Sequence, residues 1–335
     1  MDFDTLVDAA RTRLRVKVSR RENSNRQFAT DVLAGLTASP KCLSPKYFYD
    51  TTGSQLFEEI CNLPEYYPTR TERGILQQNA DEIARDCDHD MVLVEFGSGS
   101  SSKTRLLIEA FLQCNRRLHY MPIDISKSML IDSAKALLKR YPELMITALV
   151  SDYLVALQAI PHYVTQNKLI VFLGSSIGNF DNKDAVAFLQ AIRATMTEND
   201  RLLIGMDMLK SSEILVPAYD DAQGVTARFN LNLLTRINRE LGGRFDLSRF
   251  RHKALFNQGE SRIEMHIESL ENQSVEIRGI ARTITFARGE TLHTENSYKY
   301  SRQSIQQMAV RSGFAVVQHW YDEQDWFSLN LFVPL

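Results

Sequence analysis

The sequence predicts an α/β protein with a parallel, Rossmann-like sheet and a second, α+β domain, and three observations lead to this prediction. Short apolar segments alternate with amphipathic helical segments between residues 91 and 209. A glycine-rich turn follows the first apolar segment. After residue 249 the apolar residues recur at every second position, which is typical of antiparallel strands. Unbroken apolar strands separated by helices indicate a parallel sheet covered on both faces.

Length and composition narrow the class of protein. The 335 residues are enough for two domains, and 39 basic against 41 acidic residues leave a formal net charge of −2. This balance predicts no binding to nucleic acid or to an anionic membrane. Residues 1–15 predict an amphipathic helix without the apolar core of a signal peptide. The four cysteines are scattered singly and fit no metal site or secreted disulfide framework, so we expect no metal site and a cytoplasmic protein. A monomer is expected as well.

The first ninety residues predict a mainly helical region. Apolar residues fall at helical spacing over residues 25–37, 54–62 and 69–86. Between the first two helices, the segment S-P-K-C-L-S-P-K-Y-F-Y-D contains two prolines that interrupt any helix.

The alternating region that follows predicts a parallel sheet. Strands are expected at residues 91–96, 119–125, 145–150, 169–173 and 201–207, and helices at 103–114, 127–140 and 185–195. The last residues predict a helix at 301–311 and an antiparallel hairpin, formed by 314–320 and 327–333, that extends this sheet. We therefore assign residues 70–209 and 299–335 to one domain.

The region between these segments differs in its pattern. Residues 221–241 carry apolar side chains at four-residue steps and end at Gly242-Gly243, which predicts an amphipathic helix with a glycine stop. Residues 262–268, 275–280 and 283–286 alternate with a period of two and predict an antiparallel meander. We assign residues 1–69 and 210–298 to this second domain.

The turn after the first strand is the clearest local motif. V-L-V-E-F-G-S-G-S-S-S-K-T resembles a phosphate-binding loop, but Ser102 stands where that loop needs glycine. A dinucleotide fingerprint fails at the same position. What remains is an acidic residue followed by Gly97-x-Gly99 directly after a strand, which indicates a nucleoside site without a pyrophosphate.

Two acidic residues at strand ends extend this site. Asp124 ends the second strand, where a carboxylate can accept hydrogen bonds from both ribose hydroxyls, and Asp152 ends the third, where an adenine amino group is recognised. Both acids could instead cap the helices that follow them. Lys103 could contact a methionine carboxylate or be a solvated residue of a first helical turn. Together these features predict a site for S-adenosylmethionine.

Candidate substrate residues are spread along the chain. The segment F-L-G-S-S-I-G-N-F follows the fourth strand, at the sheet edge where ligands bind in such folds, although Asn179 could simply cap the next helix. Tyrosines in Y-F-Y-D, E-Y-Y-P-T-R and A-Y-D-D-A lie in irregular segments. In T-E-N-S-Y-K-Y, alternation puts Glu295 and Ser297 on one side of a strand, roughly 7 Å apart. They could grip a ring that carries donors, or face solvent.

The ordered set of motifs resembles the L-histidine Nα-methyltransferases of ergothioneine biosynthesis, which convert histidine to its trimethylated betaine, hercynine. The motifs that carry the resemblance include P-K-Y-F-Y-D, L-P-E-Y-Y-P-T-R-T-E, E-F-G-S-G-S-S-S-K-T, F-L-G-S-S-I-G-N-F, A-Y-D-D-A-Q-G-V-T-A-R-F-N-L-N-L-L, R-I-E-M-H and T-E-N-S-Y-K-Y. The resemblance implies a class I S-adenosylmethionine-dependent methyltransferase fold, with S-adenosylmethionine as cofactor and free L-histidine as substrate.

The resemblance also implies roles for individual residues. Cofactor binding is expected from Gly97, Lys103, Asp124, Asp152 and Tyr153. At the last of these positions the family pattern has phenylalanine beside adenine. The carbonyl of Gly174 and the side chain of Tyr49 are expected around the amine to be methylated.

The substrate itself is expected to be held at both ends. Its carboxylate is assigned to Asn179 and Tyr219. The imidazole pocket is assigned to Phe57, Tyr66, Met265, Glu295 and Ser297, the last two contacting the ring nitrogens.

Three alternatives remain open on the sequence. The segment G-S-G-S-S-S-K-T keeps a P-loop kinase or ATPase in consideration. A non-catalytic nucleoside-binding module is a second alternative. Methylation of another free aromatic amino acid, such as tyrosine or tryptophan, is the third, and the pair Glu295 and Ser297 favours histidine over it.

Overall fold

A computed structural model describes residues 3–8, 13–19, 24–87, 90–115 and 117–335. The chain divides into two compact units. Unit 1 comprises Met1–Arg20, Pro68–Leu209 and Lys299–Leu335, and unit 2 comprises Arg21–Tyr67 and Lys210–Tyr298. The sequence had placed residues 1–69 with the second domain. The first strands of the chain instead belong to unit 1, because they pair with its sheet.

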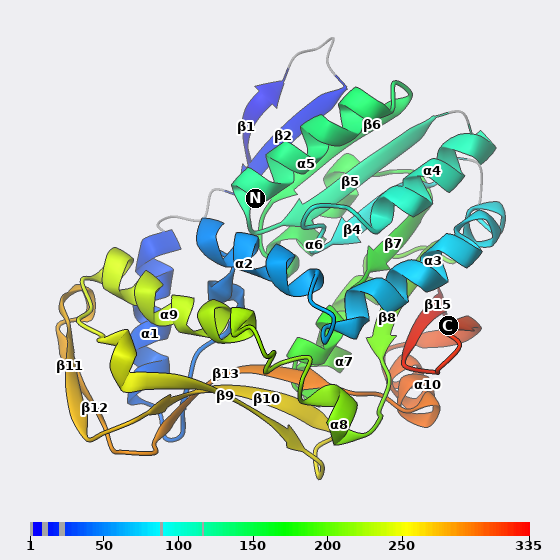
Figure 1. Cartoon of the computed structure of the whole chain (residues 1–335). Helices are drawn as coiled ribbons and strands as arrows, with labels where there is room; N and C mark the ends of the chain where they lie inside the picture. Colours follow the sequence, from blue (N-terminus) through cyan, green and yellow to red (C-terminus); the bar gives the residue numbers. More distant parts are fainter. Residues whose placement is uncertain (1–2, 9–12, 20–23, 88–89, 116) are drawn as a thin grey trace. The chain divides into compact units, whose positions relative to one another are not determined.

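The core of unit 1 is a mixed sheet with the order β1-β2-β6-β5-β4-β7-β8-β15-β14, nine strands in the described residues (Figure 1). The five predicted strands are confirmed as its parallel centre: β4 (Val92–Phe96), β5 (Leu118–Asp124), β6 (Leu144–Val150), β7 (Lys168–Phe172) and β8 (Arg201–Asp207). Every residue of β4 and β7 is buried, as expected for strands covered on both faces.

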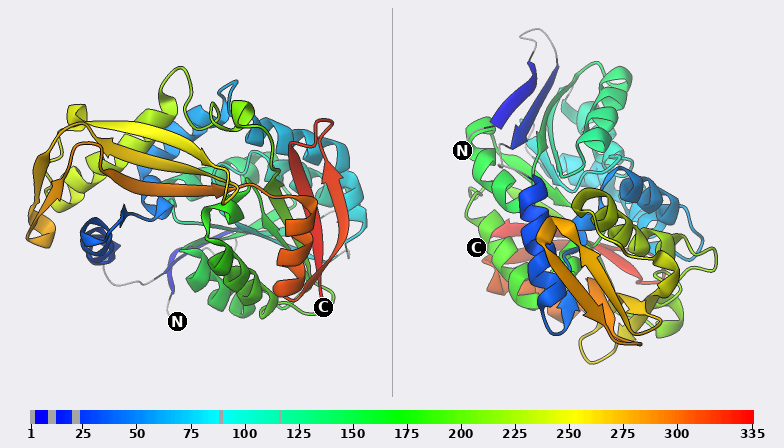
Figure 2. Two further views of the ribbon diagram at one scale, coloured as in Figure 1. Left: turned by 90° about the horizontal axis from the view of Figure 1, so that it is seen from below. Right: turned by 90° about the vertical axis from the view of Figure 1, so that its left-hand side faces the viewer.

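Helices cover both faces of this sheet (Figures 1 and 2). One face carries α3 (Tyr67–Arg85), α4 (Thr104–Asn115) and α5 (Lys127–Arg140), and the other carries α6 (Tyr153–Tyr163), α7 (Asn182–Arg193) and α10 (Arg302–Arg311). From β4 the chain adds β5 and β6 on one side of the sheet and then β7 and β8 on the other. Because the crossovers between parallel strands are right-handed, the helices of these two halves lie on opposite faces. No helix had been predicted at α6, because its apolar residues form no stripe and Pro161 lies inside it.

The prediction is confirmed at one edge of the sheet and wrong at the other. The predicted terminal hairpin is confirmed, since β15 (Phe327–Pro334) pairs antiparallel with both β8 and β14 (Phe314–Tyr321). The helix predicted over residues 1–15 is wrong. The structure has β1 (Phe3–Asp8) and β2 (Leu14–Ser19), and β2 runs parallel to β6 with Leu14 and Val16 buried. Residues 1–2 and 9–12 of that expected helix lie outside the described residues.

Unit 2 is an α+β domain around a four-stranded sheet with the order β3-β13-β10-β9. Its strands are β3 (Lys41–Cys42), β9 (Phe250–Asn257), β10 (Arg262–Ser269) and β13 (Thr291–Tyr298). The predicted meander is wrong in one respect. Between β10 and β13 the chain forms β11 (Gln273–Ile277) and β12 (Arg282–Phe286), which pair with each other in a separate two-stranded sheet.

The helices of unit 2 support this sheet. They are α1 (Ser24–Thr37), α2 (Thr51–Cys61), α8 (Ser212–Leu215) and α9 (Val225–Leu241), with single 3₁₀ turns at Pro45–Phe48, Leu247–Arg249 and Arg278–Ile280. The predicted glycine stop of α9 is confirmed, since Gly242 has a left-handed φ of 60°. Among the described residues of the whole chain, no helix has the length and apolar character needed to cross a bilayer.

Candidate active site

The glycine turn after β4 is built around Gly97. Gly97 and Gly99 have φ angles of +70° and +49°, and the Gly97 amide donates to the Ile123 carbonyl at 2.8 Å. A Cβ on Gly97 would lie 2.6 Å from the Tyr153 hydroxyl oxygen. Glycine is therefore required at 97 by both backbone and space. Ser102, which spoiled the phosphate-loop pattern, has no positive φ, so a serine fits there without strain.

Asp124 joins this turn to the end of β5. Its carboxylate accepts the Gly99 amide at 2.9 Å and the Ser126 amide at 2.8 Å. Burial raises the pKa of Asp124, and the hydrogen bonds from Ser126 and Gly99 oppose that rise. Two carboxylate oxygens have about four acceptor sites, so the group retains capacity for ribose hydroxyls. The side chain thus stabilises the backbone of the turn through these two hydrogen bonds and still fits the predicted ribose role.

Asp152 and Tyr153 begin α6 beside the same turn. Asp152 is the N-cap of α6 and accepts the Val155 amide at 3.0 Å, which is the capping geometry that the sequence left open. The Tyr153 ring packs edge-on against Phe96 and Phe172, with centroids 5.7 and 5.5 Å away. Burial raises the pKa of Tyr153, so its hydroxyl stays protonated near Gly97.

Lys103 is not the solvated residue that one interpretation allowed. Its ammonium group forms a close ion pair with Glu72 of α3, and the two side chains are 18% and 0% exposed. Both Glu72 oxygens also accept the Gly174 amide, at 2.9 and 3.0 Å. One buried carboxylate therefore connects the loop after β4 with the loop after β7.

The loop after β7 has an unusual backbone. Gly174 and Ser175 both have left-handed φ angles, +74° and +55°. The Ser175 hydroxyl oxygen accepts the Asp207 amide at 2.9 Å, which ties this turn to the end of β8. Asn179 ends the 3₁₀ turn Ser176–Asn179, and the N-cap of α7 is Asp181. The capping interpretation of Asn179 is therefore wrong.

Glu95 lies beneath the glycine turn and received no role from the sequence. It is almost fully buried and accepts close hydrogen bonds from the hydroxyls of Thr104 and Tyr120. Burial raises its pKa to about 7, against the opposing effect of those two hydrogen bonds. This acid is thus held at the base of the turn in an environment that disfavours its charge.

In unit 2, the predicted aromatic residues form one continuous group. The ring centroids of Tyr49 and Phe57 are 5.6 Å apart, those of Phe57 and Tyr66 6.2 Å, and those of Tyr66 and Tyr219 6.1 Å. Phe229 of α9 packs against Tyr49 and Phe57, at 5.9 and 6.0 Å. Such edge-on spacing is favourable for aromatic pairs and builds an apolar wall with several hydroxyls.

The polar side of this group is formed by β10 and β13. The Tyr219 hydroxyl lies 2.7 Å from the Ser297 hydroxyl, and Glu295 faces Met265 across the two strands. Glu295 is only 9% exposed. Burial, with the nearby hydroxyl of Tyr219 and the Glu295 carboxylate among further causes, raises the pKa of Tyr66 well above its ordinary value. Tyr66 therefore offers a protonated hydroxyl and not a base.

Hydrogen bonds at helix starts fix the tyrosines of this group. Asp50, next to Tyr49, caps α2 by accepting the Gly53 amide at 2.7 Å and also accepts the Asn232 side chain at 2.9 Å. Asp221 lies two residues after Tyr219 and accepts the first amides of α9 at 2.9 and 2.7 Å. Burial would raise the pKa of Asp221, but these bonds outweigh it and leave the pKa lowered.

The predicted residues thus fall into two sets. Unit 1 brings together Gly97, Lys103, Asp124, Asp152, Tyr153, Gly174 and Asn179 at the carboxyl ends of its parallel strands. Unit 2 brings together Tyr49, Phe57, Tyr66, Tyr219, Met265, Glu295 and Ser297.

Two further residues at these sets were missed by sequence reasoning. Glu72 precedes the buried residues Ile75 and Leu76 by three and four positions, so all three lie on one face of α3. An acidic residue on this buried face is the feature of the sequence that could have identified Glu72. Phe229 was recognised only as part of the apolar stripe of α9. Its partners Tyr49 and Phe57 are far away in the sequence, and no local pattern links them.

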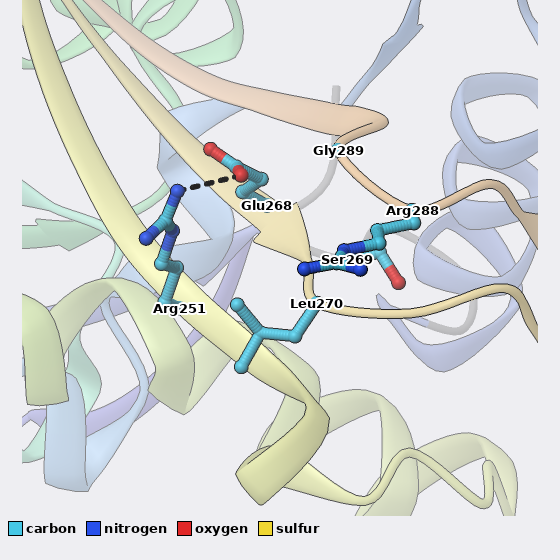
Figure 3. Close-up of a pocket in the computed structure, with 6 residues that line it drawn as sticks. All are labelled: Arg251, Glu268, Ser269, Leu270, Arg288 and Gly289. Atoms are coloured by element: carbon cyan, nitrogen blue, oxygen red, sulfur yellow. Dashed lines mark hydrogen bonds and ion pairs between the residues drawn. The ribbon is translucent and has the colours of Figure 1, made fainter.

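A separate hollow of about 360 Å³ lies on unit 2 (Figure 3). It is lined by Arg251, Glu268, Ser269, Leu270, Arg288 and Gly289. The Arg251 guanidinium donates to Glu268 at 2.8 Å within it. The hollow lies where β10 ends, at Glu268 and Ser269, and just before β13 begins. It includes none of the predicted site residues.

Comparison with known proteins agrees with the motifs. The model of a family described as histidine-specific, SAM-dependent methyltransferases matches residues 28–334. A Histidine N-alpha-methyltransferase of Mycolicibacterium smegmatis is 42% identical over 90% of this chain and 94% of its own length. One of Mycobacterium tuberculosis is also 42% identical, over 90% and 93%. Ergothioneine biosynthesis protein 1 of Schizosaccharomyces pombe is 29% identical over 83% of this chain and 37% of that protein.

Proposed function

Because the chain belongs to the family of histidine-specific, S-adenosylmethionine-dependent methyltransferases, we propose that it methylates the α-amino group of free L-histidine three times, giving hercynine, the first step of ergothioneine biosynthesis. It is an S-adenosylmethionine-dependent N-methyltransferase. The observation that carries the proposal is the match over nearly the whole chain, together with 42% identity to two proteins named for this activity.

The cofactor fits the residues of unit 1. Two glycines with positive φ leave an open backbone turn, and a Cβ on Gly99 would meet nothing within 4 Å. Beside the turn stands the Asp124 carboxylate, an acceptor suited to ribose hydroxyls. When bound, S-adenosylmethionine supplies a methyl group on a positively charged sulfur. We assign Asp124 to the ribose, Asp152 and Tyr153 to the adenine, and Lys103 to the methionine carboxylate.

The residues of unit 2 suit a free amino acid with an imidazole ring. Glu295 and Ser297 supply an acceptor and a hydroxyl beside an aromatic wall, which is the complement of a ring with two nitrogens. Within unit 2, we assign the substrate carboxylate to Tyr219 and the surroundings of the amine to Tyr49. For unit 1, the resemblance predicts that Asn179 contacts a substrate carboxylate and the Gly174 carbonyl an amine.

The chemical step requires a neutral amine, because the nitrogen lone pair attacks the methyl carbon. An α-amino group has a pKa of about 8, so one proton must leave before each transfer. Burial keeps Tyr66 protonated, so it cannot take that proton at neutral pH. We propose that tyrosine hydroxyls and water surround the amine without a strong dedicated base, so that the proton is released to solvent. Alignment then supplies most of the acceleration, which is worth roughly 7–11 kcal/mol in favourable cases.

We further propose that the protein is monomeric and cytoplasmic. The cysteines, which are scattered singly and fit no secreted disulfide framework, support the cytoplasmic location.

Incubation with S-adenosylmethionine and each free amino acid, followed by mass spectrometry, tests the function. Histidine should gain one, two and then three methyl groups. Modification of tyrosine or tryptophan instead of histidine would refute the substrate assignment. A product that stops at one methyl group would refute the trimethylation.

Two substitutions test the assigned residues separately. Glu295→Ala should raise the KM for histidine and leave cofactor affinity unchanged, with Glu276→Ala on β11, half-exposed, as the control. Asp124→Ala should raise the cofactor Kd in calorimetry, with Asp132→Ala on the exposed side of α5 as the control. An unchanged KM or an unchanged Kd, respectively, would overturn the assignment of that residue.

A further inference from the structure

The strand that carries Glu295 and Ser297 contains an extra residue. In the antiparallel pairing of β10 with β13, Met265 faces Glu295 and the next residue, His266, faces His293. Thr294 lies between these two pairs and has no opposite residue of its own. This is the register of a β-bulge, a device that re-aims the side chains on one side of it.

The bulge changes the face to which Glu295 points. Met265 and Ile267 are two residues apart on β10, so their side chains share one face of the sheet. Their partners across the ladder, Glu295 and Leu292, must share that face too, although they are three residues apart. On a regular strand, alternation from Leu292 would have placed Thr294 on this face and turned Glu295 to the opposite one.

The Thr294 hydroxyl holds the bulge closed. It lies 3.0 Å from the Met265 carbonyl and 2.8 Å from the side-chain oxygen of Asn230, both of which are acceptors. The Asn230 amide nitrogen donates in turn to the carbonyl of His266, at 2.9 Å. Thus α9, through Asn230, binds both strands at the point where their register shifts. Asn230 and Thr294 are buried, so water cannot replace these bonds.

The same chain of bonds reaches Tyr219 through His252 of β9. The Asn230 amide nitrogen, a donor only, lies 2.8 Å from Nδ1 of His252, which must therefore accept. Nε2 of His252 lies 2.8 Å from the Tyr219 carbonyl, an acceptor only, and must donate. These partners fix the neutral imidazole with its proton on Nε2. Tyr219 is thereby held at its main chain by His252 and at its hydroxyl by Ser297.

We propose that Thr294, Asn230 and His252 are positioning residues that aim Glu295, Ser297 and Tyr219 at the substrate. The Thr294 bulge turns Glu295 and Ser297 to the face where Tyr219 lies, and the bonds through Asn230 and His252 hold Tyr219 in register with them. This proposal rests on the proposed function, in which Glu295 and Ser297 contact the imidazole ring. None of the three positioning residues needs to touch the substrate.

Thr294→Val tests the proposal, because valine keeps the shape and removes the hydroxyl. We expect the KM for histidine to rise about tenfold or more, with the cofactor Kd within twofold of wild type. Thr294→Ser keeps the hydroxyl and should restore the KM to within about threefold. A wild-type KM in Thr294→Val would overturn the positioning role. A wild-type protein that does not methylate histidine would instead overturn the proposed function, and the positioning role with it.

A second measurement separates positioning from general stability. In a Glu295→Ala/Ser297→Ala background, Thr294→Val should change the KM by less than about twofold, because it acts through these two side chains. Equal effects in both backgrounds would contradict the proposal. His252→Leu removes the hydrogen bonds to Asn230 and to the Tyr219 carbonyl without changing the residues of the bulge. It should raise the KM by a smaller factor, while cofactor binding shows that the protein is folded. If Thr294→Val does not fold, an unchanged KM in His252→Leu would overturn the role of these hydrogen bonds.

Discussion

The two units hold their predicted site residues with different kinds of interaction. In unit 1, carboxylates bind backbone amides and a lysine. Glu72 accepts the Gly174 amide and pairs with Lys103, and Asp124 accepts the amides of Gly99 and Ser126. Around the bulge, unit 2 uses ring packing and neutral groups, with hydroxyls, amides and an uncharged histidine joined by hydrogen bonds, and its carboxylates Asp50 and Asp221 bind amides at helix starts.

This difference predicts different sensitivities. A buried charge is stable only while its partner is present, so unit 1 should respond strongly to the removal of one charge and to pH. Neutral hydrogen bonds each contribute less, so unit 2 should respond to single changes by smaller steps that appear in substrate binding.

Glu72→Gln should lower the free energy of unfolding by about 3–5 kcal/mol, because it removes the fully buried carboxylate that pairs with the Lys103 ammonium group. Glu72 is fitted tightly, since a Cβ on Gly205 would lie 2.0 Å from its carboxylate oxygen. Chemical denaturation gives the value. The double variant Glu72→Gln with Lys103→Met removes both charges and should recover most of the loss.

The matched control for Glu72 lies in unit 2. Arg228 and Glu59 form an ion pair at 2.9 Å with side chains 59% and 55% exposed. Glu59→Gln should change the free energy of unfolding by less than about 1 kcal/mol, because water screens that pair. Equal losses at Glu59 and Glu72 would show that burial of the charge is not what distinguishes the two units.

The pH dependence of stability should also differ between the units. Glu95 has its pKa raised to about 7 by burial, so between about pH 4.5 and 7 the folded state keeps a proton that the unfolded state has released. Its contribution therefore lowers stability as pH rises through that window, by about 3 kcal/mol, and is constant above it. Glu95→Gln should remove this slope in denaturation curves measured at several pH values. An unchanged slope would contradict the raised pKa of this buried acid.

In unit 2 the sign is opposite. Burial alone would raise the pKa of Glu264, but hydrogen bonds from Asn257, Arg262 and His266 lower it to about 2. The folded state therefore releases a proton before the unfolded state does, and this group stabilises the protein above about pH 4.5. That stabilisation is lost as the pH falls towards 2. Glu264→Gln thus serves as the counterpart of Glu95→Gln.

The fold of unit 1 was largely predictable from the sequence, because its strands are apolar runs that identify themselves locally. The five central strands and the terminal hairpin appear at the predicted positions. The strand at Leu14–Ser19 was missed because its pairing partner, β6, is more than a hundred residues away. Glu72 was missed for a similar reason, since its partners Lys103 and Gly174 come from other segments.

The site of unit 2 was predictable only in part. Alternation correctly relates Glu295 to Ser297, because no bulge lies between them. It does not say which face they occupy. That depends on the register of β13 against β10, where Thr294 is the extra residue, and register is a property of two strands and not of one. The aromatic group likewise joins Tyr49 to Phe229, residues that only the folded chain brings together.

Gly97→Ala should weaken cofactor binding about 100-fold in calorimetry, because alanine is strained at a φ of +70° and its Cβ would lie 2.6 Å from the Tyr153 hydroxyl oxygen. Adding Tyr153→Phe removes that oxygen and should recover part of the loss. Gly99→Ala is the control for backbone strain alone, since nothing lies within 4 Å of its Cβ position. Equal losses at 97 and 99, without rescue, would show that the close approach of Tyr153 is unimportant.

Tyr219→Phe should have the smallest effect, a rise of about 3- to 10-fold in the KM for histidine. The substitution removes the hydroxyl that lies 2.7 Å from Ser297 but leaves the ring in contact with Tyr66 and the main chain bonded to His252. Because the lost bond is neutral, stability should change by only about 1 kcal/mol, in contrast to Glu72→Gln in unit 1. Phe57→Leu, which alters the wall without removing a hydrogen bond, is the comparison for packing. A loss of several kcal/mol in Tyr219→Phe would mean that unit 2 depends on its polar groups as strongly as unit 1 depends on its buried charges.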